Sequence, residues 1–250
     1  MDNNVRRIGV LAPPGNVAME RELPQYLPRN VVMNHNRLSR PGSSIARDSL
    51  LAMGESVERA AHDLAQAYPE VINYGCTSGS FLEGIGKEAR IAEKITRITG
   101  IPAFTTSTAV IEAFRATKAN TIFMVTPYPD DVNEHEFAFL RHYEVALAGY
   151  DSFRCGTSEA IRAVTSEDVS AMVLNHRATI AGCDAVFISC TNLLAMDQIE
   201  YLEAELDRPV LTSNQASLWG ALVRIGVDGR GMGAGRLFEA EPPSPKQMAA

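Results

Sequence analysis

The chain has 250 residues, of which 46% are hydrophobic and 21% charged, the composition of an ordinary soluble globular protein with one large or two smaller α/β domains. Its net charge of −7 argues against a nucleic-acid partner, which would select a basic surface. No run reaches the roughly 18 apolar residues that span a membrane, and the apolar run 8–12 is too short for a signal peptide, so we expect a cytoplasmic protein.

The first part of the chain alternates between strand and helix patterns. Short apolar runs that end at small polar residues predict buried parallel strands at residues 7–12, 31–37, 71–75 and 101–105. Apolar residues at helical spacing predict helices at residues 45–68, 81–98 and 108–116. The first strand ends in the turn sequence Pro13-Pro14-Gly15-Asn16. This order of elements indicates successive strand–helix units of a parallel sheet.

The same pattern starts again at Asn120. Strands are predicted at residues 121–126, 150–155, 185–189 and 209–212, and helices at residues 131–147, 166–181, 197–206 and 216–225. A capping box at residues 165–168 opens the second of these helices. Spacing matches too, because 60 residues separate Asn16 from Cys76 and 62 separate Tyr128 from Cys190. We infer an internal repeat.

The repeat predicts an α/β fold made of two similar Rossmann-like or flavodoxin-like halves, related by a pseudo-twofold axis. Each half has a short parallel sheet with helices on both faces, and the active site lies in the cleft between the halves, beyond the carboxyl ends of the strands. Residues 1–116, with the C-terminal helix and tail 216–250, are assigned to the first domain, and residues 117–215 to the second. The glycine-rich stretch 226–236 lacks the strand and helix of a phosphate-binding loop and is predicted as a flexible turn, and residues 242–250 as disordered.

Two cysteines follow predicted strands at equivalent places in the repeat. Cys76 and Cys190 are each followed by threonine and then by a helical pattern. A helix N-terminus lowers the pKa of a thiol, so one cysteine is predicted to act as nucleophile or base and the other as acid. Cys155 and Cys183 are interpreted as small buried hydrophobic residues. The absence of a Cys-x-x-Cys pair argues against both a disulfide framework and a zinc site.

Short hydroxyl and amide side chains follow the same strand ends. Together with backbone N–H groups they can surround a small carboxylate and stabilise an enolate-like transition state without a metal. Taken one by one, each side chain is more typical of a helix N-cap, but two Cys-Thr elements together with two Thr-rich strand ends favour a site. The group comprises Thr77, Ser78, Ser80, Thr105, Thr106, Ser107, Thr191, Asn192, Thr212, Ser213 and Asn214.

Residues 13–20, 75–81, 126–134, 189–193, 209–219 and 233–237 resemble the aspartate/glutamate racemase superfamily, within it the branch that holds maleate cis–trans isomerases and arylmalonate decarboxylases. The resemblance implies two α/β domains with the site between them, catalysis without a cofactor, and a homodimer or higher homo-oligomer. In the isomerases one cysteine adds to maleate, the adduct rotates, and elimination gives fumarate with the help of the other cysteine. Cys76 matches the nucleophile and Cys190 the second cysteine.

The resemblance also implies which residues bind the substrate. Asn16 and Tyr128 match carboxylate-binding residues of the two halves. Ser158 stands where the isomerases carry a second asparagine, and Pro14-Gly15 replaces their Ser-Ser at the first turn. The predicted substrate-binding residues are Asn16, Pro14, Gly15, Thr77, Ser78, Tyr128, Thr191, Asn192 and Ser158, with no metal ligand.

The leading prediction is a cofactor-independent isomerase of a small dicarboxylate, of the maleate cis–trans type. Residues 76–81 and 128–134 look like the decarboxylases, which keep only the second cysteine and have glycine at the first position. Decarboxylation with Cys190 as proton donor, and two-base racemisation of an α-substituted acid, are therefore the alternatives. A carboxylate-binding module without turnover is the least favoured, because it needs no cysteine pair. No nucleic-acid or membrane partner is expected.

Overall fold

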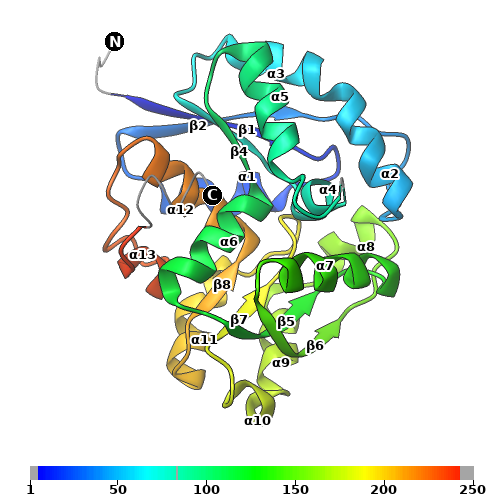
Figure 1. Cartoon of the computed structure of the whole chain (residues 1–250). Coiled ribbons are helices and arrows are strands. Elements are labelled where there is room, and N and C mark those ends of the chain that lie inside the picture. The colour runs from blue at the N-terminus through cyan, green and yellow to red at the C-terminus, as the bar shows by residue number, and fades with distance from the viewer. Residues whose placement is uncertain (1–4, 83, 243–250) are drawn as a thin grey trace.

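The computed structural model describes residues 5–82 and 84–242, which form two four-stranded parallel sheets (Figure 1). The first sheet has the order β2-β1-β3-β4 and the second the order β6-β5-β7-β8. The identical order confirms the two similar α/β halves. The strands are β1 (Arg6–Ala12), β2 (Val31–Arg37), β3 (Val71–Tyr74), β4 (Ala103–Thr105), β5 (Thr121–Thr126), β6 (Ala146–Ser152), β7 (Ala185–Ile188) and β8 (Val210–Thr212).

The helices of the first half are shorter than the sequence pattern predicts. The predicted helix 45–68 consists of α2, a 3₁₀ turn and α3, and the helix predicted at 81–98 is divided into α4 and α5. Gly84 and Gly86 separate α4 from α5 because their φ angles, 125° and 72°, lie outside the helical region. The helical elements are α1 (Ala18–Glu22), η1 (Leu23–Tyr26), α2 (Arg47–Leu51), η2 (Ala52–Ser56), α3 (Val57–Ala65), α4 (Thr77–Phe81), α5 (Ala89–Thr99) and α6 (Thr106–Thr117).

In the second half the largest correction concerns the helix predicted at 131–147. It ends at His142, the chain turns through Glu144 at a φ of 61°, and β6 starts four residues before the predicted strand. The capping box of Thr165 and Asp168 is confirmed, but the helix it opens stops at Leu174. The helical elements are α7 (Asp130–His142), α8 (Ser158–Ala163), α9 (Ser166–Leu174), α10 (Arg177–Ile180), η3 (Met196–Gln198), α11 (Ile199–Leu206), α12 (Ser213–Arg224) and α13 (Arg236–Glu239).

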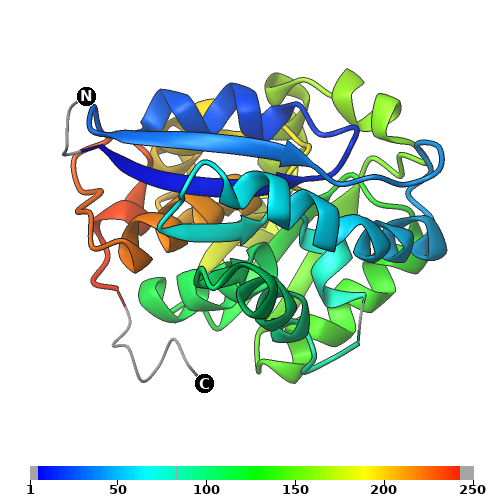
Figure 2. The ribbon, with the colours of Figure 1, turned by 90° about the horizontal axis from the view of Figure 1, so that it is seen from above.

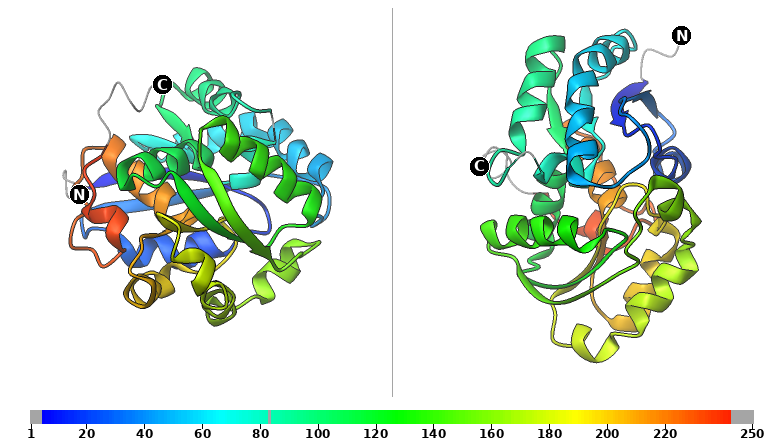
Figure 3. Two further views of the ribbon diagram at one scale, coloured as in Figure 1. Left: turned by 60° about the horizontal axis from the view of Figure 1, so that its bottom comes forward. Right: turned by 90° about the vertical axis from the view of Figure 1, so that its right-hand side faces the viewer.

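Helices cover both faces of each sheet, as right-handed crossovers require when the chain first moves one way along the sheet and then reverses. In the first half α3 and α5 pack on one face, and α1 lies on the other (Figure 2). In the second half α7 lies on one face, and α9 and α10 on the other (Figure 3). The reversal fixes where each half can bind a ligand.

The two halves share one hydrophobic core. Helices α6 and α12 lie between the sheets (Figure 1), and the ring of Phe114 on α6 meets Phe187 on β7 edge to face at 5.3 Å. Helix α12 contacts β3 of the first sheet and β8 of the second, so the assignment of residues 216–250 to the first domain stays a prediction. Continuous packing fixes the relative position of the two sheets.

Two further predictions from the sequence concern membrane-spanning helices and the glycine-rich stretch near the end of the chain. No helix within residues 5–82 and 84–242 is long and apolar enough to cross a bilayer. The glycine-rich stretch 226–236 consists of turns in which Gly226, Gly231, Gly233 and Gly235 have positive φ angles, followed by the short α13. Disorder is predicted for residues 242–250, and residues 243–250 lie outside the described part of the chain.

Candidate active site

Each sheet has one point at which the strand order reverses, and the predicted site residues follow the strands that flank it. β1 and β3 flank the reversal in the first sheet and are followed by Asn16 and Cys76. β5 and β7 flank the reversal in the second and are followed by Tyr128 and Cys190. Ligands of open α/β sheets bind at such points. The two points face each other, because all four residues line the same cavity.

This cavity brings together nine of the eleven predicted site residues. The volume of the cavity is about 30 Å³, which suits a molecule of a few non-hydrogen atoms. Pro14 and Gly15 are not among its walls. They form the turn between Pro13 and Asn16, and Gly15 packs so closely on Ser158 that a Cβ atom would lie 2.8 Å from the serine Cβ. The walls are Pro13, Asn16, Arg40, Ile45, Leu50, Cys76, Thr77, Ser78, Tyr128, Ser158, Ile161, Cys190, Thr191 and Asn192.

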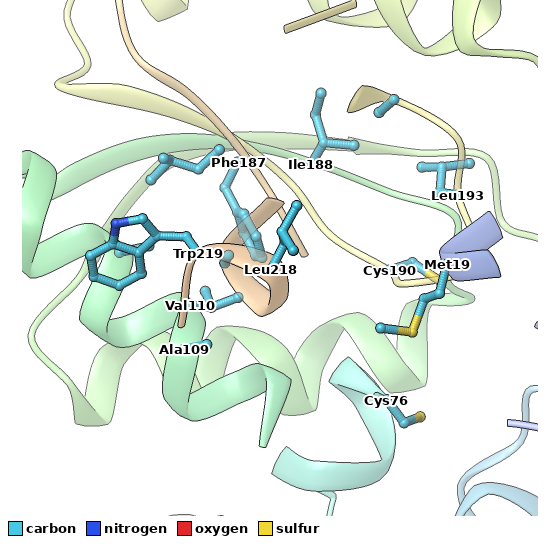
Figure 4. Packing of buried hydrophobic residues seen from close by; sticks show 14 of the residues in the cluster. Met19, Cys76, Ala109, Val110, Phe187, Ile188, Cys190, Leu193, Leu218 and Trp219 are labelled. Carbon is cyan, nitrogen blue, oxygen red and sulfur yellow. The ribbon is translucent and has the colours of Figure 1, made fainter. Parts of the chain in front are cut away.

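Cys76 is the N-cap of α4, as the sequence predicts. Its Sγ accepts a hydrogen bond from the backbone N–H of Gly79 at 3.2 Å. Figure 4 shows the Cys76 side chain at the end of this short helix. Residue 79 has to be glycine for this approach, because a Cβ atom would lie 2.9 Å from the sulfur. The N–H donor at this distance stabilises a thiolate.

Cys190 does not occupy the equivalent place, and here the sequence prediction is wrong. No helix begins after it; the chain forms a turn, and the first helical element, η3, starts at Met196. Cys190 has a φ of 111°, a conformation that costs an L-residue on the order of 1–3 kcal/mol. Its backbone N–H donates to Ser213 Oγ at 3.0 Å, and its Sγ accepts from the N–H of Asn192 at 3.4 Å. Contacts with residues distant in sequence, and not a helix N-terminus, orient this thiol toward the cavity.

Burial raises the pKa of both thiols, which reverses the predicted lowering. For Cys76 the N–H of Gly79, the hydroxyl of Ser78 and the charge of Arg40 oppose this rise in pKa. For Cys190 the hydroxyl of Tyr128 donates a hydrogen bond to the sulfur, yet burial still raises the pKa to about 12. The two thiols have different surroundings. Cys76, whose Sγ accepts the shorter N–H hydrogen bond and feels the charge of Arg40, is the better candidate for the thiolate, and Cys190, beside Tyr128, for the proton donor.

Hydrogen bonds between the halves fix the two cysteine loops relative to each other. Ser213 Oγ accepts from the backbone of Cys190 and, at 2.9 Å, from Thr77 Oγ1 next to Cys76. In return Thr191 Oγ1 donates to the backbone carbonyl of Gly75, and Asn16 Nδ2 donates to Thr191 Oγ1, both at 3.0 Å. Because these residues are buried, displacement of either cysteine loop would leave buried polar groups without hydrogen-bond partners.

Seven members of the predicted polar group lie outside the cavity wall, and several of them cap helices. Thr105 accepts from the N–H of Thr108 at the start of α6, and Thr212 forms a capping box with Gln215 at the start of α12. For these two threonines the capping interpretation holds. The other five that do not line the cavity are Ser80, Thr106, Ser107, Ser213 and Asn214.

Glu136 is a buried carboxyl group in contact with the residue that precedes Cys190. It is not among the site residues predicted from the sequence. Ser189, which precedes Cys190, donates to Glu136 Oε1 at 2.6 Å, whereas Oε2 is buried without a partner. Burial raises the pKa of Glu136 to about 8. Its charge also raises the pKa values of Tyr128 and Cys190. Nothing in the pattern of α7 distinguishes it from a surface glutamate.

We expect Glu136→Gln to flatten the pH dependence of stability. The folded protein holds the Glu136 proton up to a pKa of about 8, above the ordinary 4.5, so this proton stabilises the fold below pH 4.5 and the gain is lost as pH rises to about 8. Between these two pKa values the free energy of unfolding falls by about 1.4 kcal/mol for each unit of pH. Glutamine keeps the acceptor for Ser189 without the titration. Urea unfolding at several pH values measures this, with exposed Glu58→Gln as control; parallel curves for Glu136→Gln and wild type would contradict it.

Comparisons with known proteins show which family the chain belongs to. The arylmalonate decarboxylase family model matches residues 8–238. The arylmalonate decarboxylase of Bordetella bronchiseptica is 30% identical over 197 residues, 78% of this chain and 82% of that protein. The maleate isomerase of Nocardia farcinica is 27% identical over 246 residues, 95% of this chain and 97% of that protein.

A solved structure extends the likeness to the fold. It is a cysteine-to-serine variant of the Nocardia farcinica maleate cis–trans isomerase with a covalently bound succinylcysteine intermediate. The two folds superpose with a TM-score of 0.87 at 24% identity, over 94% of this chain and 98% of that one. With a family model that spans nearly all of the described residues, this chain belongs to the arylmalonate decarboxylase family.

Proposed function

We propose that the protein is a cofactor-independent isomerase of a small unsaturated dicarboxylate, of the maleate cis–trans type. The observation that carries the proposal is the cysteine pair, because Cys76 and Cys190 line one cavity from opposite halves of the molecule. The match to the maleate isomerase of Nocardia farcinica over 95% of the chain supports it.

The two thiols have separate roles in the proposed reaction. The thiolate of Cys76 forms a bond from Sγ to one alkene carbon of maleate, and the π electrons pass to the neighbouring carbon and its carboxylate. Cys190 donates its proton to that carbon and becomes a thiolate. The result is a succinyl adduct on Cys76, in which the former double bond is a freely rotating single bond.

Elimination reverses these steps after the rotation. The thiolate of Cys190 removes a proton from the carbon that it protonated, the C–Sγ bond breaks, and Cys76 leaves as a thiolate while fumarate forms. Tyr128 stabilises the Cys190 thiolate through its hydroxyl hydrogen bond. Asn16 and the hydroxyl group of Ser78 are proposed to bind the carboxylate at which negative charge develops.

Decarboxylation of a substituted malonate is the second candidate, because the family model and the 30% identical relative both carry that name. Loss of CO₂ would leave its electron pair on the α-carbon as an enediolate, and Cys190 would donate the proton. Cys76 has no role in this reaction. Cys76→Gly would then retain or raise decarboxylase activity, whereas the isomerase loses its nucleophile.

Proton NMR of the purified protein with maleate in D₂O tests the proposal. We expect the alkene signal of maleate to be replaced by that of fumarate, at a rate proportional to protein concentration. An unchanged spectrum would refute the maleate isomerase. The same measurement on chiral 2-substituted acids and disubstituted malonates separates the alternatives, because racemisation brings deuterium to the α position and decarboxylation releases CO₂.

A further inference from the structure

Arg40 is the one formally charged side chain among the described residues that line the cavity. It lies in the loop between β2 and α2, and its guanidinium group reaches from the first half to the second. Its terminal nitrogens donate to the carbonyl groups of Ser43 and Ser44, to Ser49 Oγ at 3.3 Å and to Ser158 Oγ at 2.7 Å. Four partners hold the group at the wall of the cavity.

Its hydrogen bonding is incomplete. The Nε–H of Arg40 is buried and has no partner, and no carboxylate lies within ion-pair distance of the guanidinium group in the described part of the chain. The carboxylate that influences its pKa is Glu159, whose side chain is exposed. A half-buried cation with an unused donor is costly unless an anion completes it.

The bound substrate would complete it. The proposed reaction brings two carboxylates and a thiolate into one enclosed site, and burial of uncompensated negative charge is strongly unfavourable. The other polar groups of the wall are neutral hydroxyls and amides, so only Arg40 can balance a full charge. Its charge acts at the reacting end of the site, because it opposes the rise that burial causes in the pKa of Cys76.

We propose that Arg40 determines substrate specificity by binding one carboxylate of a dicarboxylate, so that the site rejects acids that carry an apolar group in its place. Ser158 positions Arg40 through its hydroxyl oxygen. The inference rests on the proposed dicarboxylate substrate and adds the residue that reads the second charge. A monoanionic acid would leave Arg40 as an unpaired cation in a dry site.

Binding of unreactive ligands tests this independently of turnover. Wild type should bind succinate more tightly than butyrate, which lacks one carboxylate. Arg40→Leu is expected to weaken succinate binding about tenfold to hundredfold and to leave butyrate binding unchanged. Arg40→Lys keeps the charge without the planar donor and should lose only part of the discrimination. Calorimetric titration measures both ligands.

Arg47→Leu is the matched control, because Arg47 lies seven residues further along the same segment and is not part of the cavity wall. It should bind both ligands as wild type does. If Arg40→Leu fails to fold by circular dichroism, Arg40→Gln and Arg40→Lys take its place. Unchanged succinate binding in folded Arg40 variants, or an equal loss for both ligands, would overturn the proposal.

The test separates this inference from the proposed function. Selective loss of succinate binding in a protein that does not isomerise maleate would refute the isomerase and leave the role of Arg40 standing. If the protein isomerises maleate but Arg40→Leu still prefers succinate to butyrate as strongly as wild type does, the isomerase stands and the proposed role of Arg40 is refuted. With maleate as substrate, Arg40→Leu should raise KM more than it lowers kcat.

Discussion

Cys76→Ser is expected to lower the rate of maleate isomerisation by at least about a thousandfold without disturbing the fold. The serine hydroxyl can accept the same hydrogen bond from Gly79 N–H, so the geometry of α4 is preserved. The serine hydroxyl group, however, loses its proton far less readily than a thiol does, and its oxygen is a weaker nucleophile than sulfur. The rate is measured by proton NMR, and intact-protein mass spectrometry should detect no adduct.

Cys190→Ser separates addition from elimination in the same assay. Cys76 is still present and can add to maleate, whereas the proton donor and base of the second half is gone. We expect turnover to fall and a species heavier by one maleic acid to accumulate, because solvent water can slowly supply the proton that completes the adduct, whereas no positioned base remains to remove it for elimination. Cys183→Ser is the control, because Cys183 is buried and lies outside the cavity. Full activity of Cys76→Ser would disprove the covalent mechanism.

Local pattern was enough to predict the sheets and the places of the cysteines. Each buried strand is an apolar run that ends where small polar residues begin, and this boundary is set by the residues themselves. The bounds of β2 and β5 agree with the prediction. The internal repeat implied two similar halves with the site between them, and the structure gives both sheets the same strand order.

What the sequence could not supply depends on contacts between distant residues. Cys190 is held by Ser213, 23 positions away, in a backbone conformation that no local pattern announces. Arg40 lies in a loop without periodicity and reaches the cavity through Ser158, 118 positions away. The pKa prediction failed for the same reason, since the helix effect is local to α4 but burial of Cys76 comes from packing of both halves.

Glu22 shows how much of the stability rests on such long-range contacts. Its carboxyl group lies in α1 and accepts hydrogen bonds from the N–H groups of Ala195 and Met196, at 2.7 and 2.9 Å, and from Asn214 Nδ2 at 2.6 Å. All four residues are buried, and burial raises the pKa of Glu22. A single side chain of the first half thus satisfies three donors beyond β7.

We therefore expect Glu22→Ala to lower the free energy of unfolding by roughly 3–5 kcal/mol, because it leaves three buried donors without an acceptor. Urea unfolding followed by circular dichroism measures the loss. Glu22→Gln keeps one acceptor oxygen and should lose less, and Glu58→Ala on the exposed side of α3 should change stability by no more than about 0.5 kcal/mol. A loss in Glu22→Ala as small as that of Glu58→Ala would mean that water replaces the carboxylate, and that the shared apolar core and the other hydrogen bonds between the halves hold them together without it.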